Sequence, residues 1–253
     1  MERLFREAYQ GGAKIAVATE GALDGYVVNE IIAGEVPAKR MKEVSVSLDH
    51  PIIQRFAGEL GMCLAFGLAE RIADVYNCAV FIDHDGRICG KYHKTQLSEG
   101  AHPDWNFNRI GKSLRAFDTP IGRAGIAICN DRWNEDIARI PVLDGARYLL
   151  IPSYGDMSKN QDRAVLARAR ENGVPIVEAN VGVTMVVSKG EIVASSRKKT
   201  VVTFATIEIP ARPSRANRDR HERQFLAWRS TEMRRRYQQT REKNRVQKEK
   251  RRR

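Results

Sequence analysis

Cysteine is scarce in this 253-residue sequence, and the few that occur are scattered rather than paired. They are Cys63, Cys78, Cys89 and Cys129. So few cysteines cannot build a disulfide framework, and the lack of a CxxC pair argues against a zinc site of that type. We therefore expect free thiols, as in a reducing cytoplasm.

Long apolar runs are also missing. No stretch approaches the roughly 18 consecutive apolar residues that suggest a membrane span. The first six residues, Met1–Arg6, lack the apolar core of a secretory signal. The chain has 42% hydrophobic residues and is long enough for one large core, so it predicts a cytoplasmic globular protein.

Excess charge is absent from most of the chain, although the net charge is +12. Residues 211–253 hold 17 Lys and Arg against 5 Asp and Glu, whereas residues 1–210 hold 26 of each sign. Any argument for a polyanionic partner therefore concerns the tail alone. We expect a body over residues 1–210 and a basic, partly helical extension over residues 211–253.

Short apolar strands alternate with helical patterns along the body, which predicts one layered α/β domain. Helices are expected near Leu4–Tyr9 and at Pro51–Leu60, Asp136–Leu143 and Arg163–Glu171. Strands are expected at Lys14–Thr19, Cys63–Leu68, Cys78–Asp83, Ile126–Cys129, Tyr148–Pro152, Pro175–Ala179, Val183–Ser188, Ile192–Ser195 and Val201–Ile209.

The extension has a pattern of its own. Phe225, Trp228, Met233 and Tyr237 recur at near-helical spacing and predict a helix with an apolar side. Apolar surface left in water costs roughly 25 cal/mol per Å², so we expect that side to pack on protein, preferably on a second subunit. After Tyr237 only Val246 is apolar, and we expect the last dozen or so residues to form a frayed helix or to be disordered.

Three polar residues stand at strand ends, where chemistry is commonly placed. Cys129 follows an apolar strand and precedes a helix, whose N-terminus can lower the pKa of a thiol. Glu20 follows the run KIAVAT, and Lys94 follows a strand and hairpin turn. Taken singly, a cysteine is most often a core residue, and a lysine or glutamate most often lies at the surface.

Together the three residues make chemical sense. A carboxylate can take the proton of a thiol and leave a nucleophilic thiolate. A lysine ammonium can stabilise the oxyanion that forms when the thiolate attacks a C=O or C≡N carbon. The backbone N–H of Asn130 is placed to act as a second donor. Spacing alone does not establish this trio.

The segments around these residues resemble motifs of the nitrilase/amidase, or carbon–nitrogen hydrolase, family. ATEGALDGY resembles the family's PE-x-x-x-x-GY element, GKYHKTQL its YRK-x-HL element, and GIAICNDRWNED its IC-x-D-x-RFPE element. RAREN-x-x-PIVEANVG resembles a further family segment. The resemblance runs from about residue 1 to residue 210, and it assigns Glu20 as base, Lys94 as oxyanion donor and Cys129 as nucleophile.

The resemblance implies a four-layer α-β-β-α sandwich and hydrolysis of a non-peptide C–N bond in an amide, N-carbamoyl compound or nitrile. The reaction would pass through a cysteine thioester and implies no metal or organic cofactor. Family members commonly form homodimers or larger homo-oligomers, so we expect the same here.

Substrate-binding residues follow from the same resemblance. Glu99 is a candidate for a second glutamate that positions substrate, with a surface loop position as the alternative. CNDR resembles the nucleophile motif of N-carbamoyl amino acid amidohydrolases, in which an arginine binds the substrate carboxylate. Arg132 would be its counterpart, although Trp133 stands where those enzymes have a second arginine.

The chain also departs from the family pattern. Thr19 stands where a Pro is usual, and His93 where an Arg is usual. Family members open with a strand ahead of their first helix, and this sequence starts at that helix, so either the sequence lacks its true start or the strand has been lost. A lost strand would expose a sheet edge or leave it for another element to fill. A second hypothesis is therefore a catalytically degenerate hydrolase fold that acts as a scaffold, or that binds RNA through its basic tail.

Overall fold

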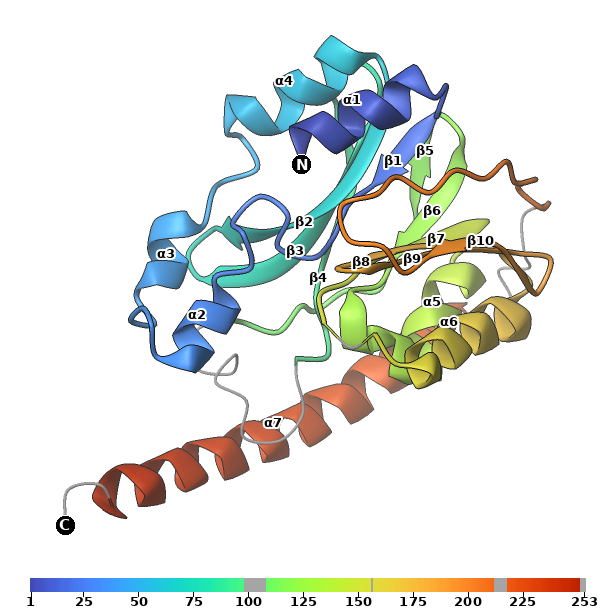
Figure 1. The fold of residues 1–253 in the computed structure, drawn as a ribbon. Helices are drawn as coiled ribbons and strands as arrows, with labels where there is room; N and C mark the ends of the chain where they lie inside the picture. The colour runs from blue at the N-terminus through green and yellow to red at the C-terminus, as the bar shows by residue number, and fades with distance from the viewer. Residues whose placement is uncertain (98–107, 156, 212–217, 251–253) are drawn as a thin grey trace.

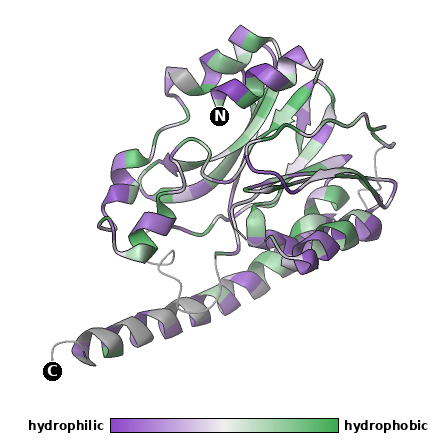
Figure 2. Ribbon diagram, viewed as in Figure 1, coloured by the Kyte–Doolittle hydropathy of each residue, from purple (hydrophilic) through white to green (hydrophobic). Residues whose placement is uncertain are grey.

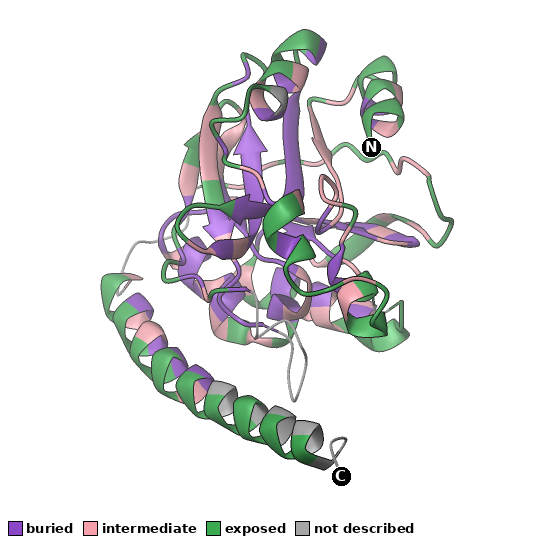
Figure 3. Cartoon of the chain, turned by 90° about the vertical axis from the view of Figure 1, so that its left-hand side faces the viewer, coloured by how far each residue is buried: buried purple, intermediate pink, exposed green. Residues whose placement is uncertain are grey.

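The computed structural model describes residues 1–97, 108–155, 157–211 and 218–250. Two sheets pack face to face, with helices on the outer side of each (Figure 1). The predicted four-layer α-β-β-α sandwich is therefore confirmed. Most strand residues are buried at the centre of the molecule (Figure 3), and many of them are apolar (Figure 2).

The first sheet has four strands in the order β1-β2-β3-β4. Strand β1 is parallel to β2, and the other neighbours are antiparallel. The strands are β1 Ile15–Val17, β2 Cys63–Arg71, β3 Val75–Ile82 and β4 Ile88–His93.

The second sheet has six strands in the order β10-β9-β8-β7-β6-β5. Its centre, β6-β7-β8, is parallel, as expected where helices cross between strands. The strands are β5 Phe117–Thr119, β6 Gly122–Ile126, β7 Tyr148–Pro152, β8 Ile176–Asn180, β9 Val183–Ser188 and β10 Glu191–Ser196.

Helices α1 and α4 cover the outer face of the first sheet, and α5 and α6 cover the second (Figure 1). Side chains alternate between the faces of a strand, so Leu64 and Phe66 of β2 face the helices while Cys63 and Ala65 face the other sheet. The body's helices are α1 Glu2–Gln10, α2 Val28–Ala33, α3 Arg40–Val44, α4 Pro51–Leu60, α5 Glu135–Leu143 and α6 Lys159–Asn172.

The last helix, α7 Arg218–Lys250, packs on the body with its first half and extends past it with its second (Figure 1). Phe225 joins the main core at 4% exposure, and Met233 contacts Leu97 and Ile110. Phe225 and Met233 of this helix therefore dock on the body of their own chain. Trp228 remains 55% exposed.

Three expectations about secondary structure are wrong. Helix α7 continues to Lys250, so the disordered alternative is wrong for the last residues up to Lys250. The strand expected at Ile126–Cys129 ends at Ile126, because Cys129 opens a short 3-10 helix, Cys129–Trp133.

The third concerns residues 201–209, which form no strand. Within the described chain their backbone groups pair with no other backbone, although Thr203 lies beside β9. They are held through side chains instead. Thr203 contacts Thr184, and Val202 packs on the apolar cluster between the first sheet and helices α1 and α4. No helix of the described segments is both long and apolar enough to cross a membrane.

Candidate active site

Glu20 lies just beyond β1, where the chain passes very close to β2. Its backbone N–H donates to the Ser153 carbonyl at 3.3 Å, and the Gly67 N–H donates to the Thr19 carbonyl at 3.0 Å. A Cβ atom on Gly67 would lie 2.5 Å from the Glu20 Cα, closer than real contacts allow. The absence of a side chain at Gly67 therefore lets Glu20 occupy its position.

A buried ion pair joins Glu20 to Lys94, the residue that follows β4. Lys94 Nζ donates to Glu20 Oε1 at 2.8 Å, and Asn77 Nδ2 donates to the same oxygen at 2.7 Å. Both charged residues are 1% exposed. Glu20 Oε2 is buried and accepts no hydrogen bond from the described residues, so one carboxylate oxygen can still accept a proton.

Cys129 occupies the turn between β6 and α5 with a φ of 51°, a conformation that non-glycine residues seldom adopt. Such strain is typical of functional turns. The thiol donates to the Tyr154 carbonyl at 3.5 Å, and Arg132 Nη2 donates to the sulfur at 3.5 Å. Tyr154 stacks on Tyr26 with ring centroids 4.0 Å apart, which holds this side of the site in place.

The charges around Cys129 act against one another. Burial, followed by the negative charge of Glu20, raises the pKa of the Cys129 thiol to about 11, although Lys94 and Arg132 both lower it. The expected lowering of this pKa is therefore wrong for the protein without substrate. At neutral pH the thiol is protonated, and it needs a base to become a nucleophile.

The structure thus brings Glu20, Lys94 and Cys129 together from three separate strand ends, and each charge acts on the thiol. An ammonium and a guanidinium beside the sulfur disfavour a metal cation at this point. The arrangement suits nucleophilic attack with a carboxylate as proton acceptor. The catalytic roles of the three residues stay predictions.

Arg132 is 1% exposed, so its guanidinium faces protein rather than solvent. Its Nη1 forms an ion pair with Glu178 and donates to Ser153 Oγ at 3.2 Å. Gln161 in turn donates to Glu178 at 2.7 Å. Burial raises the pKa of Glu178 to about 7, against the opposing effect of Arg132. Arg132 is therefore engaged by a protein carboxylate and by the thiol.

The remaining predicted site residues are placed less directly. The side chain of Asn130 donates to the Leu97 carbonyl at 3.2 Å, which fixes the residue that follows the nucleophile. Glu99 lies outside the described residues. Its proposed role, like those of Asn130 and Arg132, stays a prediction.

Sequence reasoning missed Asn77 and Asp131. Asn77 lies inside an otherwise apolar strand, which was a usable signal for a buried polar role. Asp131 Oδ2 accepts from the Ile128 backbone N–H at 2.8 Å and from the Tyr92 hydroxyl at 2.9 Å. These bonds close the turn that carries Cys129. Burial raises the pKa of Asp131 to about 6.

A family model described as carbon–nitrogen hydrolase matches residues 1–212. An N-carbamoylputrescine amidase from Arabidopsis thaliana is 31% identical over 194 residues, covering 71% of this chain and 63% of that protein. The corresponding enzyme from Solanum tuberosum is 28% identical over 229 residues, covering 84% and 72%. The chain thus spans less than two thirds of the Arabidopsis protein.

Solved structures show the same fold. A mutant of the Nesterenkonia AN1 amidase from the nitrilase superfamily superposes with a TM-score of 0.68 at 20% identity, covering 90% of this chain and 89% of that one. A carbon–nitrogen hydrolase from Helicobacter pylori gives a TM-score of 0.65 at 21% identity, covering 88% and 85%. At these identities the likeness concerns the fold alone.

Proposed function

We propose that this chain, which belongs to the carbon–nitrogen hydrolase family, hydrolyses a non-peptide C–N bond in a small amide or N-carbamoyl compound. The observation that carries the proposal is the buried Glu20–Lys94 ion pair beside the Cys129 thiol. Removing two charges from water costs free energy of folding, which a protein can retain where the charges act in function. Here they stand next to a protonated thiol on a strained turn.

In the proposed reaction Glu20 Oε2 takes the Cys129 proton as the sulfur attacks the carbonyl carbon. Lys94 Nζ and the Asn130 backbone N–H stabilise the oxyanion. The proton passes from Glu20 to the departing ammonia or amine, and a thioester remains on Cys129. Glu20 then takes a proton from water, which attacks the thioester. The C–S bond breaks to release the acid, and the proton on Glu20 returns to the Cys129 sulfur.

The state of Arg132 favours substrates without a carboxylate next to the reacting carbon. Its guanidinium is engaged by Glu178, so a substrate carboxylate would have to displace a buried ion pair. The similar enzymes from Arabidopsis and Solanum are named for N-carbamoylputrescine, which is an N-carbamoyl amine. We therefore favour simple amides and N-carbamoyl amines over N-carbamoyl amino acids.

A screen for ammonia release tests the proposal. Small aliphatic amides, N-carbamoyl amines, N-carbamoyl amino acids and nitriles would be compared with the unmodified protein, the Cys129→Ala variant and the Cys89→Ala control. We expect turnover of the first two classes, its loss in Cys129→Ala and its retention in Cys89→Ala. Turnover that survives Cys129→Ala contradicts the mechanism.

A related solved structure supports the choice of nucleophile. In one form of the Nesterenkonia AN1 amidase, acrylamide has added to the active site cysteine. The same reagent can be applied to this protein, with mass mapping of the modified residue. Addition at Cys129 is expected, and addition at Cys89 alone would count against the assignment.

A second candidate function is polyanion binding through the far half of α7. Past Met233 the helix extends from the body, and its described side chains are exposed (Figure 3). Residues 234–253 carry 11 Lys and Arg against 2 Asp and Glu. Charge of this density attracts nucleic acid, and it can coexist with a hydrolase body.

A further inference from the structure

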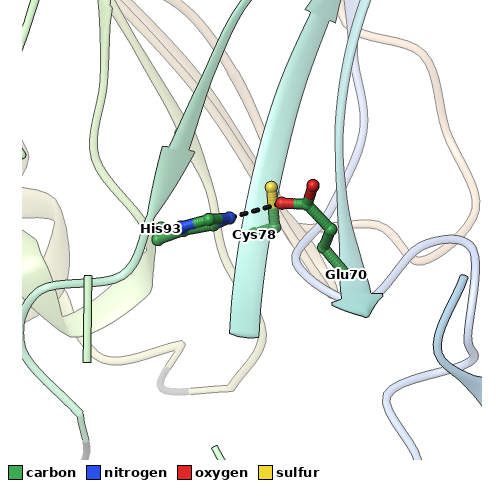
Figure 4. A group of neighbouring side chains, drawn as sticks. All are labelled: Glu70, Cys78 and His93. Carbon is green, nitrogen blue, oxygen red and sulfur yellow. Dashed lines mark hydrogen bonds and ion pairs between the residues drawn. The ribbon is translucent and has the colours of Figure 1, made fainter. Parts of the chain in front are cut away.

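A group of metal-ligand side chains lies on the first sheet, on the face away from the Glu20–Lys94 pair. Glu70, Cys78 and His93 converge there from β2, β3 and β4 (Figure 4). We propose that these three residues form a binding site for a divalent transition metal ion of the zinc type. The proposal is independent of the hydrolase reaction.

Strand register explains why the three side chains meet. Cys78 is paired with His93 across β3 and β4, and with Leu68 across β2 and β3. Glu70 lies two residues beyond Leu68 and so on the same face. Adjacent strands lie about 4.8 Å apart, which is a suitable spacing for ligands to a shared ion. Rigid strands hold such ligands more precisely than loops do.

The three ligand atoms are close enough to share one ion. The His93 nitrogen, the Cys78 sulfur and a Glu70 oxygen all lie within 4.8 Å of one another. A tetrahedral zinc ion with bonds of about 2.0–2.3 Å needs ligand atoms roughly 3.5 Å apart. Small side-chain adjustments would meet that geometry. Thiolate, imidazole and carboxylate form a donor set that zinc accepts.

The two carboxylate oxygens of Glu70 have different partners, His93 for Oε2 and Lys91 for Oε1. Oε2 faces His93 Nε2, which is where an ion would enter between them. Oε1 accepts from Lys91 Nζ at 2.6 Å and can keep that bond, as ligating carboxylates often do. Tyr76 stacks on the His93 ring with centroids 4.3 Å apart and fixes its orientation.

Metal binding requires the thiolate form of Cys78. Binding would replace the Cys78 S–H bond with a metal–sulfur bond, and the proton would pass to solvent. Burial, reinforced by Glu70, raises the pKa of the Cys78 thiol well above its usual value. The thiolate therefore needs the metal to form at neutral pH.

Lys91 is the opposing charge, and its side chain is 39% exposed, so solvent screens its ammonium while it keeps its bond to Glu70 Oε1. The His93 side chain is 18% exposed and lies on the side from which an ion and a fourth, water ligand would approach. The site is thus enclosed around the thiol and carboxylate and open at the imidazole.

The site lies directly behind the residues that bind Glu20, which indicates a role in stabilising the sheet. Cys78 follows Asn77 and His93 precedes Lys94, and both of these neighbours donate to Glu20 from the opposite face. An ion bound to Cys78 and His93 would tie β3 to β4 directly behind those donors. We infer that it stabilises the sheet and touches no reacting atom.

Cobalt substitution tests the proposal in the full-length protein. The protein would be stripped with a chelator and titrated with Co²⁺, because a cobalt–thiolate bond gives an intense near-ultraviolet absorption that carboxylate and imidazole ligands do not. We expect one equivalent of Co²⁺ to produce this band and Zn²⁺ to abolish it. Zn²⁺ should also raise the thermal unfolding midpoint.

Matched variants assign the ligands. Cys78→Ser should remove the band. His93→Arg keeps a cation beside Glu70 but cannot ligate, and should weaken Co²⁺ binding by at least about 10-fold. Cys63→Ser, which alters a thiol on the other face of the sheet, should keep the band. No band in the unmodified protein, or equal loss in Cys63→Ser, overturns the proposal.

Discussion

Arg132 links the Cys129 thiol to a buried carboxylate. One guanidinium nitrogen donates to the Cys129 sulfur at 3.5 Å, and the other is paired with Glu178. The thiol therefore touches a positive charge whose position is set by a third residue. Glu178 holds the guanidinium of Arg132, and Arg132 in turn contacts the nucleophile candidate Cys129.

Removing Arg132 alone should destabilise the fold strongly. Arg132→Met leaves Glu178 buried without its partner, and breaking such a pair costs about 3–5 kcal/mol. The double change Arg132→Met/Glu178→Met replaces both charges with apolar groups and should recover most of that loss. Urea unfolding of the three proteins measures the difference. Equal stability of the single and double variants would show that Glu178 is not held by Arg132.

The pH dependence of alkylation should report the charges around the thiol. Because the pKa of Cys129 is about 11, its rate of reaction with iodoacetamide should rise about tenfold per pH unit through the neutral range. Glu20→Gln removes a charge that raises this pKa, so its profile should move to lower pH. Lys94→Met removes a charge that lowers it, so its profile should move to higher pH.

Those two shifts have opposite signs, although both variants should lose turnover. Mass mapping restricts the measurement to Cys129, and Cys89 serves as the internal comparison because its pKa is also about 11. Profiles that coincide for all three proteins would mean that neither charge acts on the thiol.

Gly67→Ala should disable the site through backbone geometry. The new Cβ would lie 2.5 Å from the Glu20 Cα and 2.6 Å from the Gly21 nitrogen, so this backbone must move. Displacing a catalytic group by about 1 Å can cost about 100-fold in rate. We expect a loss of that order in kcat/KM.

Gly58→Ala is the matched control for that change. Gly58 lies in α4, and a Cβ there would meet its nearest neighbour, the Asp85 carbonyl oxygen, at an ordinary 3.6 Å. It should keep full activity and gain up to about 1 kcal/mol of stability from helix propensity. Similar activity in the two variants would show that the close approach of Gly67 to Glu20 does not matter for catalysis.

Ending the chain at Met233 should separate the two candidate functions. The truncation keeps Phe225 and Met233, which pack on the body, and removes most of the exposed basic residues. Hydrolase activity and thermal stability should be unchanged. If the tail binds RNA, the full-length chain alone should show salt-sensitive binding. Equal RNA binding by both proteins would exclude the tail as the binding element.

Local patterns predicted the body well. The range Pro51–Leu60 was expected as a helix and is one, because its apolar residues recur at helical spacing and Gly61 ends it. Tyr148–Pro152 was likewise expected as a buried strand. Such elements depend on periodicity and burial, which neighbouring residues largely determine.

What the sequence could not show depends on contacts between distant residues. Residues 201–209 have the apolar pattern of a strand, yet their backbone forms no hydrogen-bonded ladder with a described strand. Glu178 gave no sign of its pairing with Arg132, since 46 residues separate them. Glu20 and Lys94 were found through family motifs, because 74 residues of intervening chain hide their contact.

Strand β1 spans three residues, is hydrogen-bonded along one side only and remains partly exposed. Glu20 follows it by three positions, so the proposed base depends on the least supported strand of its sheet. Short edge elements open with a smaller free energy than whole-chain unfolding requires. Brief detachment of β1 from β2 would withdraw the carboxylate while the rest of the core stays folded. The fraction of molecules with Glu20 in place would then depend on the equilibrium between attached and detached β1. Amide hydrogen exchange at Ala18 and Gly67 can measure this equilibrium, because both N–H groups donate between the β1 segment and β2.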